Sequence, residues 1–390
     1  MVQFTIAPTA DMPINSLRIA ILNYVVSQQK GTPFLVRIDD LESEKNIEGK
    51  DSEIMQILEK FALKHHSVFH QSEHLNLYQT LALRLLKEKK AFICKCLSDS
   101  SCNNNCQERS SKEHEALKSA KEKFLIRLIE DSSVVIMQED GKPSYTFASA
   151  TDDMMSGITM IIQEEQYLKD YAKQIAIQKL LGYEKSIESI SIPSISNAPS
   201  LLSLFEEGFV PDAILNYLLL LNNPRLSQEI FTLPYAIEFF SLDDIPTSFP
   251  TFELDKLRHI NREHLKLMDD KQLSTLFGFA DADIGQLAKF YLTKECFTIK
   301  DLEAKIRPIF TPKDFSGKWG KEMKQLSEII FQAPYFETFE PFKAHLMAQS
   351  KLEDDTLLLA LNQLLTNSEE RVELNELYPF IKSYILEVAS

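Results

Sequence analysis

The stretch "VQFTIAPTADMPINSLRIAILNYVVSQQ", residues 2–29, joins a strand pattern to a helix pattern through the turn "ADMPINSLR", residues 10–18. Apolar residues dominate 2–8 and recur at helical spacing over 16–30, which predicts a strand followed by a helix. The alternation continues with a second strand pattern at 33–39 and helical patterns at 51–64 and 74–90. This order is typical of a mostly parallel α/β sheet, whose first turn is a common place for a nucleotide.

The second half of the chain has a different pattern. Residues 93–121 are polar and rich in Ser, Asn, Cys and Lys, so we interpret them as an insertion. Short strand patterns return at 122–137 and 157–163, and from about residue 201 nearly all apolar spacing is helical. We therefore expect a parallel-sheet α/β part to about residue 200 and only helices from about 225 to the end.

Length and charge limit the class of protein. A chain of 390 residues suggests two or three domains. No run of 18 apolar residues and no signal-peptide pattern is present, so we expect a cytoplasmic protein without a membrane partner. The formal net charge of −15 argues against non-specific coating of nucleic acid, and no DNA partner is expected, but a local basic patch remains compatible with it.

Four of the five cysteines fall within 13 residues. Thiolates at this spacing can surround Zn²⁺, and the polar "SDSSCNNNC" offers no core in which thiols could be buried. We predict a structural zinc ion, with His114 as a substitute ligand; the alternative is a set of free thiols in a loop. The predicted ligands are Cys94, Cys96, Cys102 and Cys106.

Several long segments resemble one known family. "FLVRIDD", "HQSEHLNLYQTLALRLLKEKKAFICKC", "DGKPSYTFASATDDMMSGITMII" and "GFVPDAILNYLLLL" are similar to glutamyl-tRNA synthetase, a class I aminoacyl-tRNA synthetase. The resemblance covers most of the chain and fades after about residue 300. It implies ATP-dependent activation of glutamate and its transfer to tRNA. It also implies a Rossmann-type catalytic domain over 1–200, interrupted by a zinc-type insertion at 93–121, then helical stem-contact-like (201–300) and anticodon-binding-like (301–390) domains.

The catalytic signatures of the family are altered in this chain. The HIGH-type motif aligns with Pro13, Ile14, Asn15 and Ser16. Proline has neither a side-chain donor nor a backbone N–H, and Asn15 adds a side chain where a nucleotide would need room. The KMSKR-type loop, whose lysines neutralise pyrophosphate in the family, has no counterpart, because no Lys or Arg occurs from Ser186 to Pro224. ATP binding is therefore not expected.

The amino-acid pocket is altered as well. Gln3 and Gln163 align with the two arginines that the family uses for the glutamate side chain, and Asp39 replaces a glutamate that meets the amino group. Tyr145 matches the family's tyrosine in this pocket. An amide cannot replace the charged, bidentate contact of an arginine with a carboxylate.

These observations favour a catalytically degenerate paralogue that binds tRNA, a true synthetase or a tRNA-maturation enzyme. One alternative is an active ligase for glutamate or another acid with a remodelled site. A second alternative is a protein-interaction scaffold without RNA binding, which the net charge favours. Three other features have structural interpretations. We expect Asp152 and Asp153 to support the fold around the pocket, and His65, His66 and His70 to be solvated or structural. The basic residues of 313–324 either contact phosphate or form a solvated helix face.

Overall fold

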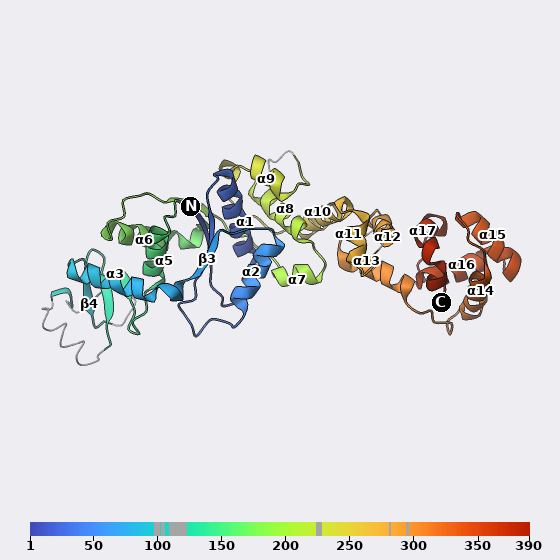
Figure 1. Cartoon of the computed structure of the whole chain (residues 1–390), viewed down its shortest axis with the longest axis horizontal. Helices are drawn as coiled ribbons and strands as arrows, with labels where there is room; N and C mark the ends of the chain where they lie inside the picture. The colour runs from blue at the N-terminus through green and yellow to red at the C-terminus, as the bar shows by residue number, and fades with distance from the viewer. Residues whose placement is uncertain (97–101, 103–105, 109–122, 224–227, 281, 294–295) are drawn as a thin grey trace. The chain divides into compact units, whose positions relative to one another are not determined.

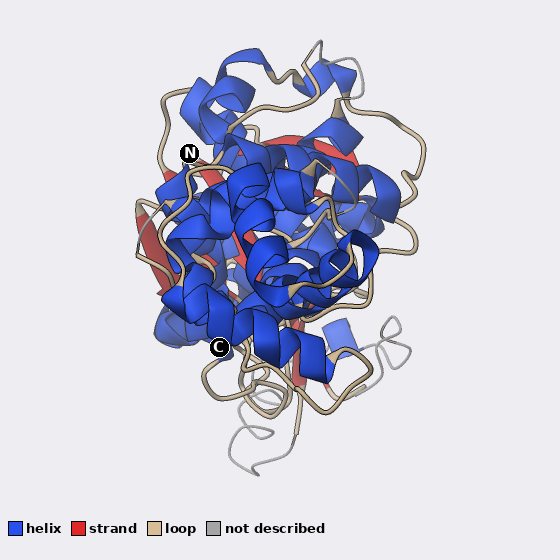
Figure 2. Ribbon diagram, turned by 90° about the vertical axis from the view of Figure 1, so that its right-hand side faces the viewer, coloured by secondary structure: helices blue, strands red, loops and turns tan. Residues whose placement is uncertain are grey.

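The computed structural model describes residues 1–390 except 97–101, 103–105, 109–122, 224–227, 281 and 294–295 (Figure 1). The chain divides into two compact units. Unit 1 comprises Met1–Leu201 and Leu218–Phe252, and unit 2 comprises Leu202–Tyr217 and Glu253–Ser390. Coloured by secondary structure, the chain shows few strands among many helices (Figure 2), and the named strands all belong to unit 1.

Unit 1 is built on a five-stranded parallel sheet with the order β3-β2-β1-β7-β8. The central strands β1 and β2 are buried on both faces, as expected for a parallel sheet covered by helices. Helix α1 packs against β1, β2 and β7. The strands are β1 (Val2–Ile6), β2 (Phe34–Ile38), β3 (Ser67–His70), β7 (Met160–Glu164) and β8 (Glu188–Ile192). The helices are α1 (Ile14–Gln29), α2 (Lys50–Lys60), α3 (Leu75–Lys87), α5 (Tyr145–Met155), α6 (Leu168–Leu180) and α9 (Leu233–Phe239).

A second, antiparallel sheet of three strands also belongs to unit 1. Its order is β4-β5-β6, with β4 at Ala91–Cys94, β5 at Leu125–Leu128 and β6 at Val135–Met137. The strand patterns at 122–137 are therefore confirmed as strands, but they pair with 91–94 rather than with the parallel sheet. Strand β8 is an edge strand that our sequence analysis did not predict, because its Ser and Glu residues weaken the apolar pattern.

Unit 2 is helical. Its described residues form no strand. In the described chain beyond residue 225, β structure is limited to Thr251, which forms an isolated bridge with Ser196. The predicted α/β-then-helical architecture is thus confirmed. Helices α7 (Leu201–Glu206) and α8 (Pro211–Asn222) precede α10 (Leu254–Leu267), α11 (Asp270–Thr275), α12 (Asp283–Leu292), α13 (Ile299–Ile306), α14 (Gly320–Gln332), α15 (Phe339–Ser350), α16 (Asp354–Thr366), α17 (Leu374–Ile381) and α18 (Ile385–Val388).

Two details show how the helices are fixed in unit 2. Gly285 allows α12 to approach α11, because a Cβ at this position would lie 1.9 Å from the Asp270 carbonyl oxygen. The buried Asn261 side chain accepts from the Val210 backbone N–H at 2.8 Å and donates to the Phe297 carbonyl at 2.7 Å, so it joins three segments.

Among the described residues, no helix has the length and apolar character needed to cross a membrane.

Candidate functional site

The order of the parallel sheet places a crevice at the carboxyl ends of its central strands. From β1 the chain moves to β2 and β3 on one side and later returns to β7 on the other, so the winding reverses between β1 and β7. Ligands of open parallel sheets bind outside the carboxyl ends of the strands at such a reversal. A cavity of about 1050 Å³ lies there, lined by β1 and its following turn, by Asp39 after β2, and by the end of β7.

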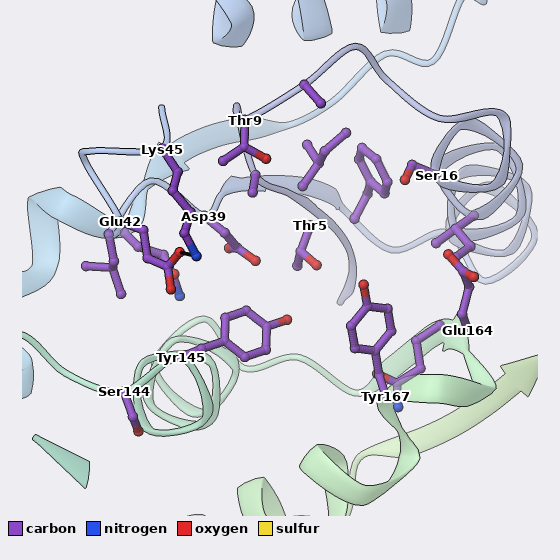
Figure 3. Close-up of a pocket in the computed structure, with 18 of the residues that line it drawn as sticks. Thr5, Thr9, Ser16, Asp39, Glu42, Lys45, Ser144, Tyr145, Glu164 and Tyr167 are labelled. Carbon is purple, nitrogen blue, oxygen red and sulfur yellow. Dashed lines mark ion pairs between the residues drawn. The ribbon is translucent and has the colours of Figure 1, made fainter. Parts of the chain in front are cut away.

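Two tyrosines define the interior of this cavity. Figure 3 shows the rings of Tyr145, from α5, and Tyr167, from the turn after β7, extending into the space that Thr5 and Asp39 face. Ser16 from the first turn of α1 and Glu164 from β7 line the far side of the cavity (Figure 3). Burial raises the pKa of both tyrosines, and neighbouring carboxylates raise it further.

The HIGH-type positions form the first turn of α1. Pro13 is the N-cap residue in an extended conformation, and no side chain caps the helix. Pro13 and Ser16 line the cavity, whereas Ile14 is buried in the core. The Asn15 side chain does not line the cavity; its Oδ1 accepts a hydrogen bond from the Ile195 backbone N–H at 2.9 Å. Asn15 thus anchors the chain after β8 and, contrary to our expectation, takes no room from the cavity, at which Ser16 is the sole side-chain hydroxyl of this motif.

A buried ion-pair network underlies the positions of Gln3 and Asp39. The Arg37 guanidinium donates to Asp39 at 2.6 Å, to Asp153 at 3.1 Å and to the Ser149 hydroxyl at 3.0 Å. Gln3 Nε2 donates to Asp153 Oδ1 at 2.9 Å. Burial raises the pKa of both aspartates, that of Asp153 to about 6, and Arg37 opposes both increases. The guanidinium is therefore committed to protein carboxylates.

The two glutamines at the expected arginine positions lie on neighbouring strands. Gln3 on β1 and Gln163 on β7 both line the cavity. The amide of Gln163 donates to the Ser189 hydroxyl at 3.3 Å. The structure brings these positions together with Asp39 and Tyr145, as the resemblance implies, but both positions present a neutral amide already engaged with the protein.

Each lysine in the described wall of the cavity has a carboxylate partner. Lys45 pairs with Glu42 at 2.5 Å, and Lys142 lies 3.9 Å from Asp140. No arginine is among the described residues that line this wall. The cavity therefore presents carboxylates in excess and no uncommitted cation within the part of the chain that the structure describes.

Arg18 and Asn222 form a clamp that our sequence analysis did not predict. Arg18 is 1% exposed; its Nε donates to Asn222 Oδ1 at 2.9 Å and its Nη1 to the Pro193 carbonyl at 2.6 Å. Burial lowers the pKa of Arg18 to about 10. The clamp holds the segment after β8, where the resemblance led us to expect the KMSKR-type loop. The sequence gives no signal for this contact, because the partner lies 204 residues away.

Asp152 supports the fold beneath the cavity. This fully buried carboxylate accepts from the Tyr78 hydroxyl at 2.8 Å and from Gln71 Nε2 at 2.9 Å, and lies 3.0 Å from His74 Nδ1. Asp152 and Asp153 therefore face different buried donors, which agrees with the structural role we assigned to them.

The four clustered cysteines converge at the end of β4. Their Sγ atoms all lie within 4.8 Å of one another; Cys96 Sγ is 3.8 Å from that of Cys102 and 4.0 Å from that of Cys106. Four sulfurs at ~2.3 Å from a tetrahedral Zn²⁺ would be about 3.8 Å apart, so the residues fit this metal. The other candidate ligand, His114, lies outside the described residues.

The remaining candidates do not assemble into a site in the described structure. His65 and His66 are exposed, and the nearest carboxylate of His70 is Asp51 at 3.4 Å. Within 313–324 only the residues from Gly320 on are helical. Lys313 is buried and its Nζ donates to the carbonyls of Pro308 and Ile309, so its amine is directed into the protein.

Comparison with known proteins identifies the architecture around this cavity. A family model described as "tRNA synthetases class I (E and Q), catalytic domain" matches residues 1–127 and 127–265. "Glutamate–tRNA ligase 2" of Sulfurovum sp. is 48% identical over 430 aligned positions that cover all of both chains. The protein of the same name from Sulfurimonas denitrificans is 38% identical over 432 positions, again covering both chains fully. Since this chain has 390 residues, it lacks residues that both relatives have.

Solved structures show the same fold. A glutamate tRNA ligase from Elizabethkingia meningosepticum, crystallised in complex with its amino acid, superposes with a TM-score of 0.79 at 18% identity and covers 100% of this chain and 98% of its own. The parallel sheet followed by a helical half and the full-length sequence similarity support the same family assignment. The chain belongs to the glutamyl-tRNA synthetase family of class I tRNA synthetases.

Proposed function

We propose that this chain is a glutamyl-tRNA synthetase paralogue that does not form an aminoacyl-adenylate and acts by binding tRNA or a partner of tRNA metabolism, such as a true synthetase or a tRNA-maturation enzyme. One observation carries the proposal: the described wall of the cavity holds six carboxylates and two lysines, and both lysines, Lys45 and Lys142, lie beside carboxylates. The two arginines near the cavity, Arg18 and Arg37, are engaged by protein groups.

The chemistry of adenylation explains why this matters. Attack of a carboxylate on the α-phosphate builds negative charge on phosphate oxygens while pyrophosphate leaves, so the site must present donors and cations. Removing one such donor from a preorganised site costs about 2.7–4 kcal/mol. Loss of two would slow the reaction about 10⁴-fold or more, since each ~1.4 kcal/mol is tenfold in rate.

The cysteine cluster supports a structural metal as part of this proposal. We infer that Cys94, Cys96, Cys102 and Cys106 hold one Zn²⁺, which would cross-link the chain at the end of β4 without taking part in chemistry. The expected compartment is the cytoplasm, where closely spaced cysteines serve metals more often than disulfides.

An active ligase with a remodelled site is the second candidate. The observation in its favour is the 48% identity over the full chain to a protein named as a glutamate–tRNA ligase. A scaffold without RNA binding is the third, and the net charge of −15 favours it.

ATP–pyrophosphate exchange with each of the twenty amino acids separates the first candidate from the second. We expect no exchange above the rate without amino acid, while an active glutamate–tRNA ligase assayed in parallel gives a clear signal. The reactions are repeated with total tRNA, so that an activity that needs bound tRNA is not missed. Exchange with any amino acid, with or without tRNA, would overturn the proposal.

A further inference from the structure

We propose that the cavity at the carboxyl ends of β1, β2 and β7 binds a small organic cation carrying two or more ammonium groups. Such a ligand is opposite in charge to glutamate and ATP. The inference deepens the proposed function and rests on it, because a cavity that still accepted ATP could not prefer a cation.

The charge of the wall is the first observation. Six carboxylates and two lysines line the cavity: Asp11, Asp39, Glu42, Glu44, Asp140 and Glu164, with Lys45 and Lys142. The cations behind this wall do not restore the balance. Lys50 is shared between Asp11 and Glu53, and Arg37 is shared between Asp39 and Asp153. Anions are therefore repelled and cations attracted in the cavity.

Aromatic rings are the second observation. Tyr145 and Tyr167 extend into the cavity from two different elements (Figure 3), and both keep about two fifths of their surface exposed. The face of an aromatic ring attracts an ammonium group, and rings combined with carboxylates recognise alkylammonium ligands. Asp39 and Glu164 contribute to the raised pKa of these tyrosines, which agrees with a negative field at both rings.

Buried acceptors without donors are the third observation. Gln3 and Gln71 belong to the cavity wall and are 2% and 0% exposed. Their amide nitrogens donate to Asp153 and Asp152, which fixes the orientation of both amides. Each Oε1 receives no hydrogen bond from the described protein. Both oxygens are buried, so they do not bond a ligand directly; their unpaired partial negative charge lies beneath the wall and adds to its attraction for a cation.

The spacing of the carboxylates favours an extended cation over a metal ion. Within the described residues, only the cysteine cluster brings three or more His, Cys, Asp or Glu ligand atoms within 4.8 Å of one another. The acids of the cavity come from β2, from β7 and from separate loops, and they surround about 1050 Å³. A chain with ammonium groups at both ends can reach carboxylates on two walls, which a single ion cannot.

Isothermal titration calorimetry with cadaverine, a five-carbon diamine, tests the inference. Glutarate, a five-carbon dicarboxylate, serves as the probe of reversed charge. At low salt we expect saturable binding of one cadaverine per chain and no binding of glutarate. Glu164→Gln should weaken cadaverine at least fivefold, and Ser194 can still donate to the new amide, so the variant should fold. Glu238→Gln, at an exposed position of α9 outside the cavity, is the matched control and should bind as the unchanged protein does.

A second pair of variants distinguishes the contribution of the Tyr167 ring to cadaverine binding from that of general surface charge. Tyr167→Leu should weaken cadaverine at least threefold, and Tyr167→Phe, which keeps the ring, should restore binding. Glutarate binding, non-saturable cadaverine binding, or equal effects of Glu164→Gln and Glu238→Gln would overturn the inference. Pyrophosphate exchange, measured on the same samples, keeps the two proposals distinct. If neither exchange nor cadaverine binding is observed, only this inference is rejected. If exchange is observed, the proposed function is rejected.

Discussion

Arg37 is the residue on which the interior of the α/β unit depends most. Its guanidinium is 2% exposed and contacts two buried aspartates that come from β2's end and from α5. Charges removed from water are tolerated only when they are paired and hydrogen-bonded. Arg37 thus holds together the carboxylates beneath the cavity, and Gln3 completes the network as a neutral donor.

Replacement of Arg37 tests this role. Arg37→Met should lower the free energy of unfolding by about 3–5 kcal/mol at pH 7, because two buried carboxylates lose their cation. Arg84→Met is the matched control: this arginine pairs with Glu88 on the exposed surface of α3, and its loss should cost less than about 1 kcal/mol. Urea unfolding followed by circular dichroism measures both. Equal losses in the two variants would contradict the assigned role.

His264 gives a prediction about pH. The buried ring contacts Asn216 Oδ1 at 2.8 Å, and burial lowers its pKa below the ordinary 6.5. Below about pH 6.5 the unfolded chain therefore binds more protons at this position than the folded chain, so stability falls as the pH decreases. We expect the stability difference between pH 7.5 and pH 5.5 to shrink in His264→Gln, measured by urea unfolding at both values. An unchanged difference would show that His264 does not titrate as described.

At the scale of elements, the antiparallel sheet β4-β5-β6 carries the cysteine cluster. Cys94 is the last residue of β4, and the buried Arg127 of β5 donates to the Cys96 carbonyl at 3.1 Å and to the Ser132 carbonyl at 2.9 Å. The strand ends therefore position the backbone of the cluster. A zinc ion would add cross-links to the small buried cluster that Phe92, Cys94 and Cys106 form at this end of the sheet.

Metal analysis tests the cluster. The purified protein should contain about one equivalent of zinc, and Cys96→Ser should lose it, since three thiolates hold zinc less tightly than four. Cys296→Ser changes a buried cysteine of the helical unit outside the cluster and should retain the metal. Mass spectrometry under native conditions and a thiol titration measure both. Less than about half an equivalent of any metal in the unchanged protein would reject the site.

At the scale of the whole molecule, the net negative charge must be reconciled with the proposed binding of tRNA. The chain carries −15 overall, so any contact with tRNA depends on local basic groups and is sensitive to salt. In the proposed function the cavity does not bear on such contacts, because adenylation acts on ATP and an amino acid and not on the body of the tRNA. A chain that cannot charge tRNA can still bind it.

A tRNA shift assay tests this separation. We expect binding of total tRNA at about 50 mM salt and a loss of at least tenfold in affinity by about 200 mM, because several phosphate contacts release counterions. A double-stranded DNA of similar length and charge is the control and should bind more weakly. Absence of a shift even at low salt, with pyrophosphate exchange also absent, would favour the scaffold hypothesis instead.

The sequence by itself determined the features that depend on local pattern. Apolar period separates the strands and helices of the first 90 residues from the helices beyond 225, because side chains repeat every two residues in a strand and every 3.6 in a helix. The absence of Lys and Arg from Ser186 to Pro224 can be read from the sequence alone, and so can the cysteine spacing. These features require no knowledge of which distant residues meet.

Tertiary structure alone decided which groups meet at the site. Arg18 is clamped by Asn222 across 204 residues, and Arg37 meets Asp153 across 116, so neither arginine is available to a ligand. Asn15 bonds to the backbone at Ile195 instead of facing the cavity, and β4 pairs with β5 instead of joining the parallel sheet. Long-range pairing depends on how whole elements pack and carries no sequence period. The acidic character of the cavity wall therefore emerges only when β1, β2, β7 and their loops are brought together.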